Sequence, residues 1–571
     1  MGPAEHYASF MPHPRPFYYL ENFCTALAWL QRRYGDLLND GEQRFIAAFG
    51  ELPRESAALL VRMIGRKGDL FRAAKLQYSE IGCLREAAPP LLRLGWLDCR
   101  PILSIADLGR LLRKSELQRV FNVTGPARAV CKADLLKHIG VSCDESRALL
   151  EWWPQAPDTI YRLGVNSLCE RLRLLFFGNW HQDWSQFVLT ELGIFRYEKV
   201  ACDCDTRAFR TRAHIDTFHA LFACRQRLED SDDIEGLLLE LPPRVADNEW
   251  LESKRRKLQF RMAQCCERRN NLARALEIYS NCEYAGSRLR AVRLLERLER
   301  TNEAFCLAAR IREQPADEVE AQQVSRMWPR LQRKTGLTPQ RTRPRQAWSA
   351  FQLVLPAAAR PGRLEGAVGE ALSQPHAPVR YVENGLLNSL FGLLCWEAIF
   401  APVAGAFFHE FQAAPADLHA PEFHLRRSSF FARCFAQLDT DAYRDTIQCT
   451  FQQKRGIQSP FVFWGLMSET LLCLALDCLP REHLKVCFGR ILANIRSNRA
   501  GLPDLVQFWP GERRYRLIEV KGPGDRLQDN QIRWLTFCVS HGIPVSVCHV
   551  SWHSAEAPGA AGRLRAAGER A

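Results

Sequence analysis

Two acidic residues and a lysine near the end of the chain, Asp504, Glu519 and Lys521, have the types and spacing needed to hydrolyse a phosphodiester. Carboxylate oxygens suit Mg²⁺ or Mn²⁺, and such an ion can activate water and stabilise charge on a phosphate. The compact ammonium of Lys521 can orient the attacking water or neutralise the phosphate in the transition state. A bare Glu-x-Lys is usually a surface ion pair, so the context of the three residues decides between the two interpretations.

The segment that holds these residues predicts a β-hairpin. Residues 501–508 and 515–522 flank a short connection in which Gly511-Glu512 suits the central pair of a tight turn. A hairpin centred there puts Asp504 opposite Glu519, with Cβ atoms about 5 Å apart, and two facing anions need a cation between them. On the second strand, alternate residues share one face: Leu517, Glu519 and Lys521. The opposite face holds Ile518 and Val520.

The order Pro-Asp, apolar strand, Glu-Val-Lys resembles the PD-(D/E)XK nuclease superfamily, and more narrowly the VRR-NUC domain of the Fanconi-associated nucleases. The likeness continues through the segments Gly522-Pro523, Asp525–Leu527, Gln528–Leu535 and Val545–Val550. Farther upstream it includes Val382–Gly385, Ser389–Trp396, Phe17–Phe23 and Lys75–Ile81. The resemblance therefore extends over most of the chain.

This resemblance implies roles for individual residues. Glu383, Asp504 and Glu519 bind Mg²⁺ or Mn²⁺ through their carboxylates, the Val520 carbonyl completes the coordination, and Lys521 is the catalytic lysine beside Asp504 and Glu519. Gln531 supports the site or contacts a DNA phosphate.

The resemblance also implies an activity. Family members cut branched DNA near 5′ flaps and trim it 5′ to 3′ in the repair of interstrand crosslinks. We therefore expect a metal-dependent endo- and exodeoxyribonuclease of the phosphodiesterase I type. Its partner is branched or 5′-flap DNA, bound by a monomer or by a DNA-dependent dimer.

Length and charge agree with a multidomain protein that binds a polyanion. The chain has 571 residues, of which 47% are hydrophobic and 25% charged, and Lys+Arg 77 against Asp+Glu 64 gives a net charge of +13. That excess favours nucleic acid or an anionic membrane surface over a cationic partner. No apolar run is long enough to span a bilayer, and we expect no membrane association. The scattered cysteines lack CxxC spacing, which predicts free thiols.

The sequence patterns and the resemblance together predict the elements that position the site. We expect a multidomain, mainly α protein with a C-terminal α/β PD-(D/E)XK (VRR-NUC) nuclease domain. We expect six divisions of the chain: an N-terminal helical DNA-binding region (1–100), a SAP-like region (101–145), a helical linker region (146–250), a TPR-like helical domain (251–370), the VRR-NUC domain (371–552) and a disordered tail (553–571). From Phe17 to about Ala88, apolar residues recur at helical spacing, which predicts an all-helical start.

Two regions have more specific patterns. Short helices at Ser115–Phe121 and Lys132–Ile139, joined by a Gly125-Pro126 turn, resemble a SAP module, a small DNA-binding hairpin in which Leu117 and Val120 pack towards Leu135 and Leu136. Farther on, Asn271–Leu276 is echoed by Asn302–Leu307 at an offset of 31 residues, which is near the period of a TPR-like helical hairpin.

Basic side chains of the helical regions are candidates for contacts with DNA phosphates, although a solvated helix face has the same pattern. The DNA-binding candidates are Arg62, Arg66, Lys67, Lys114, Arg119, Arg128, Lys132 and Gln531.

Two alternative functions remain open at this point. One is a non-catalytic DNA-repair scaffold whose TPR-like region docks proteins, and the other is a junction-resolving or RNA-directed nuclease. No GxSxG elbow or P-loop occurs, so hydrolysis should need only metal and water. Eukaryotic members of the family carry an N-terminal zinc finger that is missing here. This favours a bacterial form, cytoplasmic and nucleoid-associated, whereas a eukaryotic form is expected in the nucleus.

Overall fold

The computed structural model describes residues 16–123, 130–142, 145–184, 196–230, 233–339, 348–356 and 364–552. It divides into two compact units: Met1–Phe195 with Arg210–Ile215, and Arg196–Phe209 with Asp216–Ala571. Three sequence expectations lie outside the described residues: the Gly125-Pro126 turn, Arg128 and the tail 553–571. No described helix combines the length and the apolar character needed to cross a bilayer.

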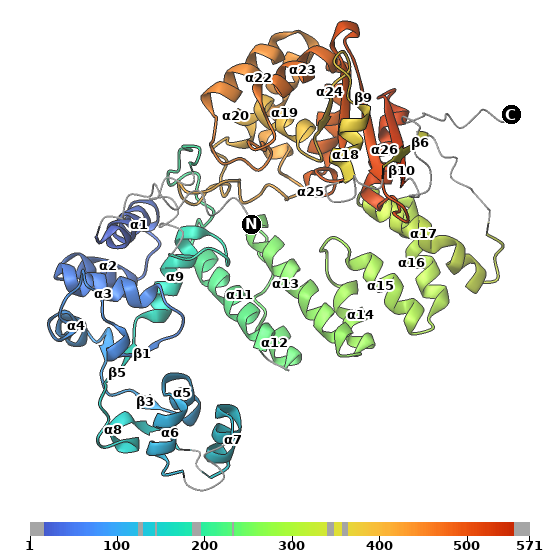
Figure 1. Cartoon of the computed structure of the whole chain (residues 1–571). Coiled ribbons are helices and arrows are strands. Elements are labelled where there is room, and N and C mark those ends of the chain that lie inside the picture. The colour runs from blue at the N-terminus through green and yellow to red at the C-terminus, as the bar shows by residue number, and fades with distance from the viewer. Residues whose placement is uncertain are drawn as a thin grey trace. The chain divides into compact units, whose positions relative to one another are not determined.

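The first unit begins with four helices: α1 (Tyr18–Tyr34), α2 (Asp40–Gly50), α3 (Arg54–Ile64) and α4 (Leu84–Arg93) (Figure 1). Apolar residues three or four apart on α1, such as Phe23, Leu27 and Leu30, are buried in the core. The prediction of an all-helical start is wrong in one respect. Strand β1 (Leu70–Arg72) pairs with β5 (Ile160–Leu163), which also pairs with β2 (Leu97–Asp98). Such short strands depend on a distant partner, which helical periodicity cannot reveal.

The predicted SAP-like hairpin is confirmed where the structure describes it. Its elements are β3 (Ile102–Leu103), α5 (Ile105–Leu111), α6 (Lys114–Val120), α7 (Lys132–Ser142), β4 (Arg147–Ala148) and α8 (Leu149–Trp152). Leu117 and Leu135 are fully buried in one core, with Val120 and Leu136 packed against it. The unit also contains α9 (Asn166–Phe177).

A row of helices leads from α11 (Arg212–Asp230) into the second unit. The helices that follow are α12 (Ile234–Glu240), α13 (Glu249–Arg268), α14 (Leu272–Ser280), α15 (Ser287–Arg297), α16 (Thr301–Glu313) and α17 (Glu318–Lys334). Consecutive helices from α13 to α17 pack side by side, and we call α13 to α17 the solenoid (Figure 1). The echoed segments lie at the starts of α14 and α16, where Asn271 is the N-cap of α14 and Asn302 is the second residue of α16. The TPR-like repeat stays a prediction.

A five-stranded sheet forms the centre of the C-terminal region. Its order is β6 (Ser349–Leu355), β10 (Val545–Trp552), β9 (Arg514–Lys521), β8 (Leu505–Trp509) and β7 (Val379–Tyr381). Strand β10 is parallel to both of its neighbours, whereas β8 is antiparallel to β9 and β7. Strand β6 and helix α18 (Leu364–Leu372) belong to this fold although they precede residue 371. The sheet therefore begins before the expected start of the nuclease domain, because β6 forms one edge of the sheet by pairing with β10.

The predicted hairpin register is confirmed, but the predicted two-residue turn is wrong. Leu505 lies opposite Ile518 and Trp509 opposite Arg514. Residues Pro510–Glu512 form a 3-10 turn and Arg513 adopts a left-handed conformation with φ 50°, so the loop has four residues. This loop has the same centre as the predicted turn, and the register is therefore unchanged.

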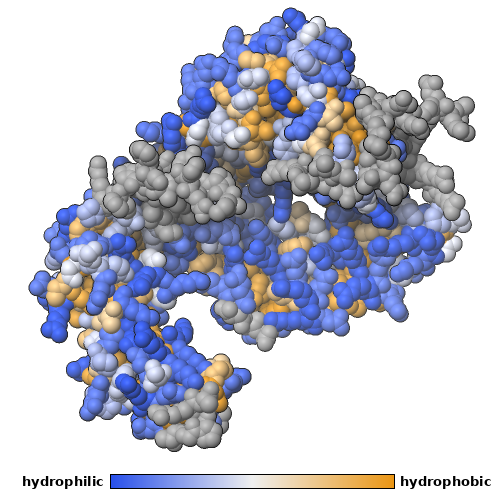
Figure 2. Space-filling view, in the orientation of Figure 1, coloured by the Kyte–Doolittle hydropathy of each residue, from blue (hydrophilic) through white to orange (hydrophobic). Residues whose placement is uncertain are grey.

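The two faces of the sheet bury different cores. One face packs against helices of this region: α19 (Leu386–Leu394), α20 (Trp396–Ile399), α21 (Ser428–Ala436), α22 (Ala442–Gln453), α23 (Glu469–Cys478), α24 (Arg481–Ala493), α25 (Ile495–Asn498) and α26 (Asp529–Ser540). Leu517 belongs to that core, whereas Ile518 and Val520 join Val368 of α18 on the other face, as alternation predicts. On the visible surface, hydrophilic residues cover most of the coloured area, with apolar residues showing in patches among them (Figure 2).

Candidate active site

Asp504, Glu519 and Lys521 come together at one end of the β8–β9 pair. Asp504 precedes β8, and its Oδ2 accepts a hydrogen bond of 2.8 Å from the backbone N–H of Val520. The Nζ of Lys521 lies 2.9 Å from Oε1 of Glu519. All three residues are buried, with exposed fractions of 9% for Asp504, 0% for Glu519 and 8% for Lys521. The surface Glu-Lys pair that the sequence left as the alternative is therefore not what this chain forms.

Burial and nearby negative charges raise the pKa of both carboxyl groups. Burial, followed by the charge of Asp504, raises the pKa of Glu519 to about 8, against the opposing effect of Lys521. Burial also raises the pKa of Asp504 to about 6, although the Val520 N–H and Lys521 favour its charged form. One ammonium therefore does not balance two buried carboxylates, and the site favours an additional positive charge.

Glu383 is held beside Asp504 through its backbone. The N–H groups of Val382 and Glu383 donate to the carbonyl oxygen of Asp504 at 2.8 and 3.1 Å. The backbone of the next residue, Asn384, is left-handed with φ 52°. Its side-chain oxygen accepts a 3.0 Å hydrogen bond from the N–H of Leu502. The exposed Glu383 carboxylate accepts a hydrogen bond from the hydroxyl of Tyr381. The structure thus brings the backbone of Glu383 to the site, while its carboxylate is turned towards Tyr381.

Gln531, in the first turn of α26, orients Glu519. Its Nε2 donates to Oε1 of Glu519 at 2.6 Å, and its Oε1 accepts from the backbone N–H of Gln528 at 2.8 Å. The second bond belongs to a capping box at the start of α26 and fixes which end of the amide faces Glu519. Of the two roles expected for Gln531, this geometry corresponds to support of the site.

The oxygen atoms of this site fit a divalent cation. Oε2 of Glu519 is buried and has no hydrogen-bond partner within the described part of the chain, which is costly unless a cation binds it. The Val520 N–H points past the end of β8 to Asp504, and the carbonyl of the same residue points to the same side of the strand. Among the described residues, no three His, Cys, Asp or Glu side chains are yet grouped as a metal cage.

Two further residues of the site escaped the sequence analysis. Glu365, in the first turn of α18, adds a negative charge that raises the pKa of Asp504. Gly501 has φ +91°, and a Cβ built on it lies 2.6 Å from the backbone carbon of Asn530 in α26. Only glycine allows this approach between the segment before Asp504 and the helix that carries Gln531. For Gly501, the one signal in the sequence was a glycine shortly before Pro-Asp. For Glu365, the sequence held no signal that it lies near Asp504.

The basic candidates lie in the first unit and differ in their surroundings. Arg62 pairs with Glu80 at 2.5 Å and stacks on Tyr19, and Lys132 donates to the carbonyl of Leu112 at 2.7 Å, so both stabilise the fold. Arg66 and Lys67 are exposed just after α3, although Arg66 also donates to the carbonyl of Lys75 at 3.0 Å. In α6, Lys114 is half-buried and Arg119 is exposed. The exposed residues remain the stronger candidates for phosphate contacts.

Three known domain families match successive parts of the chain. Residues 17–98 match the description "FAN1, HTH domain", residues 102–152 match the Fanconi anemia-associated nuclease SAP domain, and residues 439–552 match the VRR-NUC domain. The last of these segments contains Asp504, Glu519, Lys521 and Gln531.

Similar proteins extend the likeness to almost the whole chain. A Fanconi-associated nuclease 1 homolog from Pseudomonas aeruginosa is 51% identical over 546 residues, which cover 95% of this chain and 97% of the relative. A homolog from Oryza sativa subsp. japonica is 24% identical, over 93% of this chain and 62% of the relative. Crystal structures of paFAN1 bound to 5′-flap DNA with a gap, with 2-nt and 1-nt flaps, give TM-scores of 0.88 and 0.87 at 50% identity. Both cover 95% of this chain and 100% of the solved chain.

The close approach at Gly501 generates a test of how the site is held. Gly501→Ala should lower the free energy of unfolding by more than about 1 kcal/mol, because the left-handed conformation and the contact with Asn530 both disfavour a Cβ. Denaturant unfolding of the purified protein measures this change. Gly511→Ala is the matched control, since a Cβ built on Gly511 has nothing within 4 Å. Equal stability of the two variants would contradict the proposed contact.

Proposed function

Because the chain belongs to the Fanconi-associated nuclease family as a bacterial-type member, we propose that it is a divalent-metal-dependent, structure-specific DNA nuclease. It cuts near 5′ flaps as an endonuclease and trims 5′ to 3′ as an exonuclease of the phosphodiesterase I type, in the repair of interstrand crosslinks. The observation that carries the proposal is the buried pair of Asp504 and Glu519, faced by the single ammonium of Lys521.

The metal site of this proposal consists of the Glu383, Asp504 and Glu519 carboxylates and the Val520 carbonyl. When bound, Mg²⁺ or Mn²⁺ supplies a Lewis acid that stabilises charge on the phosphate and makes water a better nucleophile. Support comes from the unpartnered Oε2 of Glu519 and from hard oxygen donors at the end of β8 and β9.

The protein's own groups prepare the reaction. Gln531 holds one oxygen of Glu519 at 2.6 Å, so the other oxygen keeps a fixed direction. Lys521 is the catalytic lysine of the proposal. Its ammonium lies 2.9 Å from Glu519, and it donates hydrogen bonds that can orient the attacking water or stabilise charge on the phosphate. Burial of these groups strengthens each electrostatic interaction among them.

Branched DNA is the substrate that the similarities and the charge support. The paFAN1 chains, 50% identical to this one, are bound to 5′-flap DNA, and this chain carries a net charge of +13. A monomer or a DNA-dependent dimer fits the proposal. A non-catalytic scaffold has no use for two carboxylates buried against their mutual repulsion, and a junction-resolving nuclease differs from this proposal in its preferred substrate.

Isosteric replacement of either carboxylate tests the catalytic assignment. Asp504→Asn and Glu519→Gln should each lower cleavage of a labelled 5′ flap by more than about 10²-fold and leave DNA binding unchanged, because the loss falls on the reacting groups. Cleavage is measured with Mn²⁺ and with EDTA on 5′-flap, 3′-flap, four-way-junction, single-stranded DNA and RNA substrates. Glu512→Gln, in the exposed hairpin loop, is the control. An Asp504→Asn protein that cuts at the wild-type rate would refute the assignment.

The acidity of the site predicts how metal binding depends on pH. Asp504 and Glu519, with pKa values of about 6 and about 8, hold protons that a cation must displace. The apparent affinity for Mn²⁺ should therefore rise between pH 6 and pH 8, with release of protons. Titration calorimetry in buffers of different ionisation enthalpy measures both quantities. An affinity that is constant over this range would show that the pair does not bind the metal.

The exposed cations of the first unit predict the salt dependence of DNA binding. Replacing Arg66 and Lys67 by Ala should reduce the slope of log K against log salt by about 2, because each phosphate contact contributes about 0.9. Fluorescence anisotropy with a labelled flap at several salt concentrations gives this slope. A variant with Arg481 and Lys485 replaced by Ala loses the same charge elsewhere and serves as the control. Equal slopes in the two variants would contradict a role for Arg66 and Lys67.

A further inference from the structure

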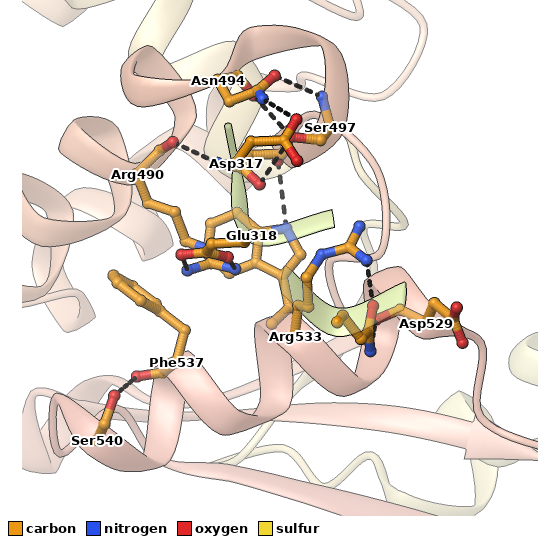
Figure 3. Close-up of polar contacts among 12 residues, drawn as sticks. Asp317, Glu318, Arg490, Asn494, Ser497, Asp529, Arg533, Phe537 and Ser540 are labelled. Carbon is orange, nitrogen blue, oxygen red and sulfur yellow. Dashed lines mark hydrogen bonds and ion pairs between the residues drawn. The ribbon is translucent and has the colours of Figure 1, made fainter. Parts of the chain in front are cut away.

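Helix α17, the last helix of the solenoid, contacts the first two turns of α26. Gln322 of α17 donates to the carbonyl oxygen of Asp529 at 3.2 Å and accepts from the guanidinium of Arg533 at 2.6 Å. One turn further along α17, Arg326 forms an ion pair of 2.5 Å with the carboxylate of Asp529. The polar groups of both α26 residues are visible in the close-up, where Arg533 reaches towards α17 (Figure 3). A helix of the solenoid thus holds a helix of the nuclease region at two positions.

A second group of contacts fixes the start of α17 to the neighbours of α26. Arg490 of α24 forms two bonds of 2.9 and 2.6 Å with the carboxylate of Glu318, and its guanidinium lies over the rings of Trp534 and Phe537 of α26 (Figure 3). Asn494 Nδ2 donates to Asp317 at 3.1 Å. The buried Arg490 thereby connects α17, α24 and α26 in one cluster.

Gln531 lies between the two α26 residues that α17 holds. Asp529 and Arg533 are four residues apart and share one face of α26. Gln531 is two residues from each, which at 100° per residue puts it on the opposite face. That face meets the active site, where Gln531 donates to Glu519 at 2.6 Å. The first turn of α26 is therefore held between α17 and the buried carboxylate.

We propose that α17 is a positioning element of the active site, and that Gln322 and Arg326 set the position of α26 at which Gln531 meets Glu519. The inference rests on the proposed function, because it takes Glu519 as a metal ligand. Neither residue touches the reacting atoms; both act through Gln531. The solenoid then contributes to the affinity of the nuclease for its metal.

The exposure of these groups separates positioning from simple stabilisation. The side chains of Arg326 and Asp529 are 53% and 41% exposed, and ion pairs of such exposure contribute little to folding. Removal of Arg326 should therefore leave the protein folded while α26 loses one of its anchors.

The first experiment measures Mn²⁺ binding by titration calorimetry in the full-length protein. In the double variant Gln322→Ala/Arg326→Ala, the Kd for Mn²⁺ should rise about tenfold, because loss of support around a metal ligand lowers the affinity for the metal. The kcat on a 5′ flap should fall with the KM for DNA unchanged. Arg330→Ala is the matched control on the same helix, because Arg330 pairs with Glu296 inside the solenoid at 2.6 Å. Thermal unfolding checks that each variant is folded. If the double variant is not folded, the single variant Arg326→Ala is measured in its place.

A double-mutant cycle with Gln531→Ala tests whether Gln322 and Arg326 act on Glu519 through Gln531. If Gln322 and Arg326 act through Gln531, replacing them by Ala in the Gln531→Ala protein should not raise the Kd for Mn²⁺ any further. An unchanged Kd in the α17 variants, an equal loss in Arg330→Ala, or a full additional loss in the Gln531→Ala background would each overturn the inference. Absence of Mn²⁺ binding by the wild-type protein would instead overturn the proposed function on which it rests.

Discussion

Asp504 and Glu519 are buried next to each other, and the only ammonium paired with them in the described site is that of Lys521. Two carboxylates in such a place repel each other, and burial makes the charged form of each more costly. Their raised pKa values express this cost. A divalent cation removes both penalties at once, so the arrangement that is unfavourable for folding is favourable for metal-dependent hydrolysis. The surrounding elements are best understood as the means of holding these two side chains in place.

Four segments that are distant in the sequence provide this support. The β8–β9 register brings Asp504 to Val520, and the backbone of Val382 and Glu383 holds the Asp504 carbonyl. Gly501 lets the strand approach α26, whose Gln531 reaches Glu519. Behind α26, the end of the solenoid contacts the same helix turn. The helical region and the nuclease region thus meet at the element that orients a proposed metal ligand.

Local patterns in the sequence were sufficient for part of this structure. The centre of the hairpin and the alternation of Leu517 and Ile518 predicted the pairing of Asp504 with Glu519 and the two faces of the sheet, because both depend only on neighbouring residues. Non-local features were not predictable. Three features each depend on a partner far along the chain: the pairing of β6 with β10, the charge of Glu365 near Asp504, and the hydrogen bonds of Gln322 to α26. The turn of the Glu383 carboxylate towards Tyr381 likewise depends on local packing that spacing does not encode.

The most direct test of the central claim is a crystal structure of the protein with Mn²⁺, recorded at a wavelength where manganese scatters anomalously. The account predicts an anomalous peak among the oxygens of Asp504, Glu519 and Val520, within direct coordination distance of each. It also predicts that the Glu383 carboxylate has turned from Tyr381 to the ion. A manganese ion bound elsewhere, with Lys521 still the only cation at Glu519, would contradict the account.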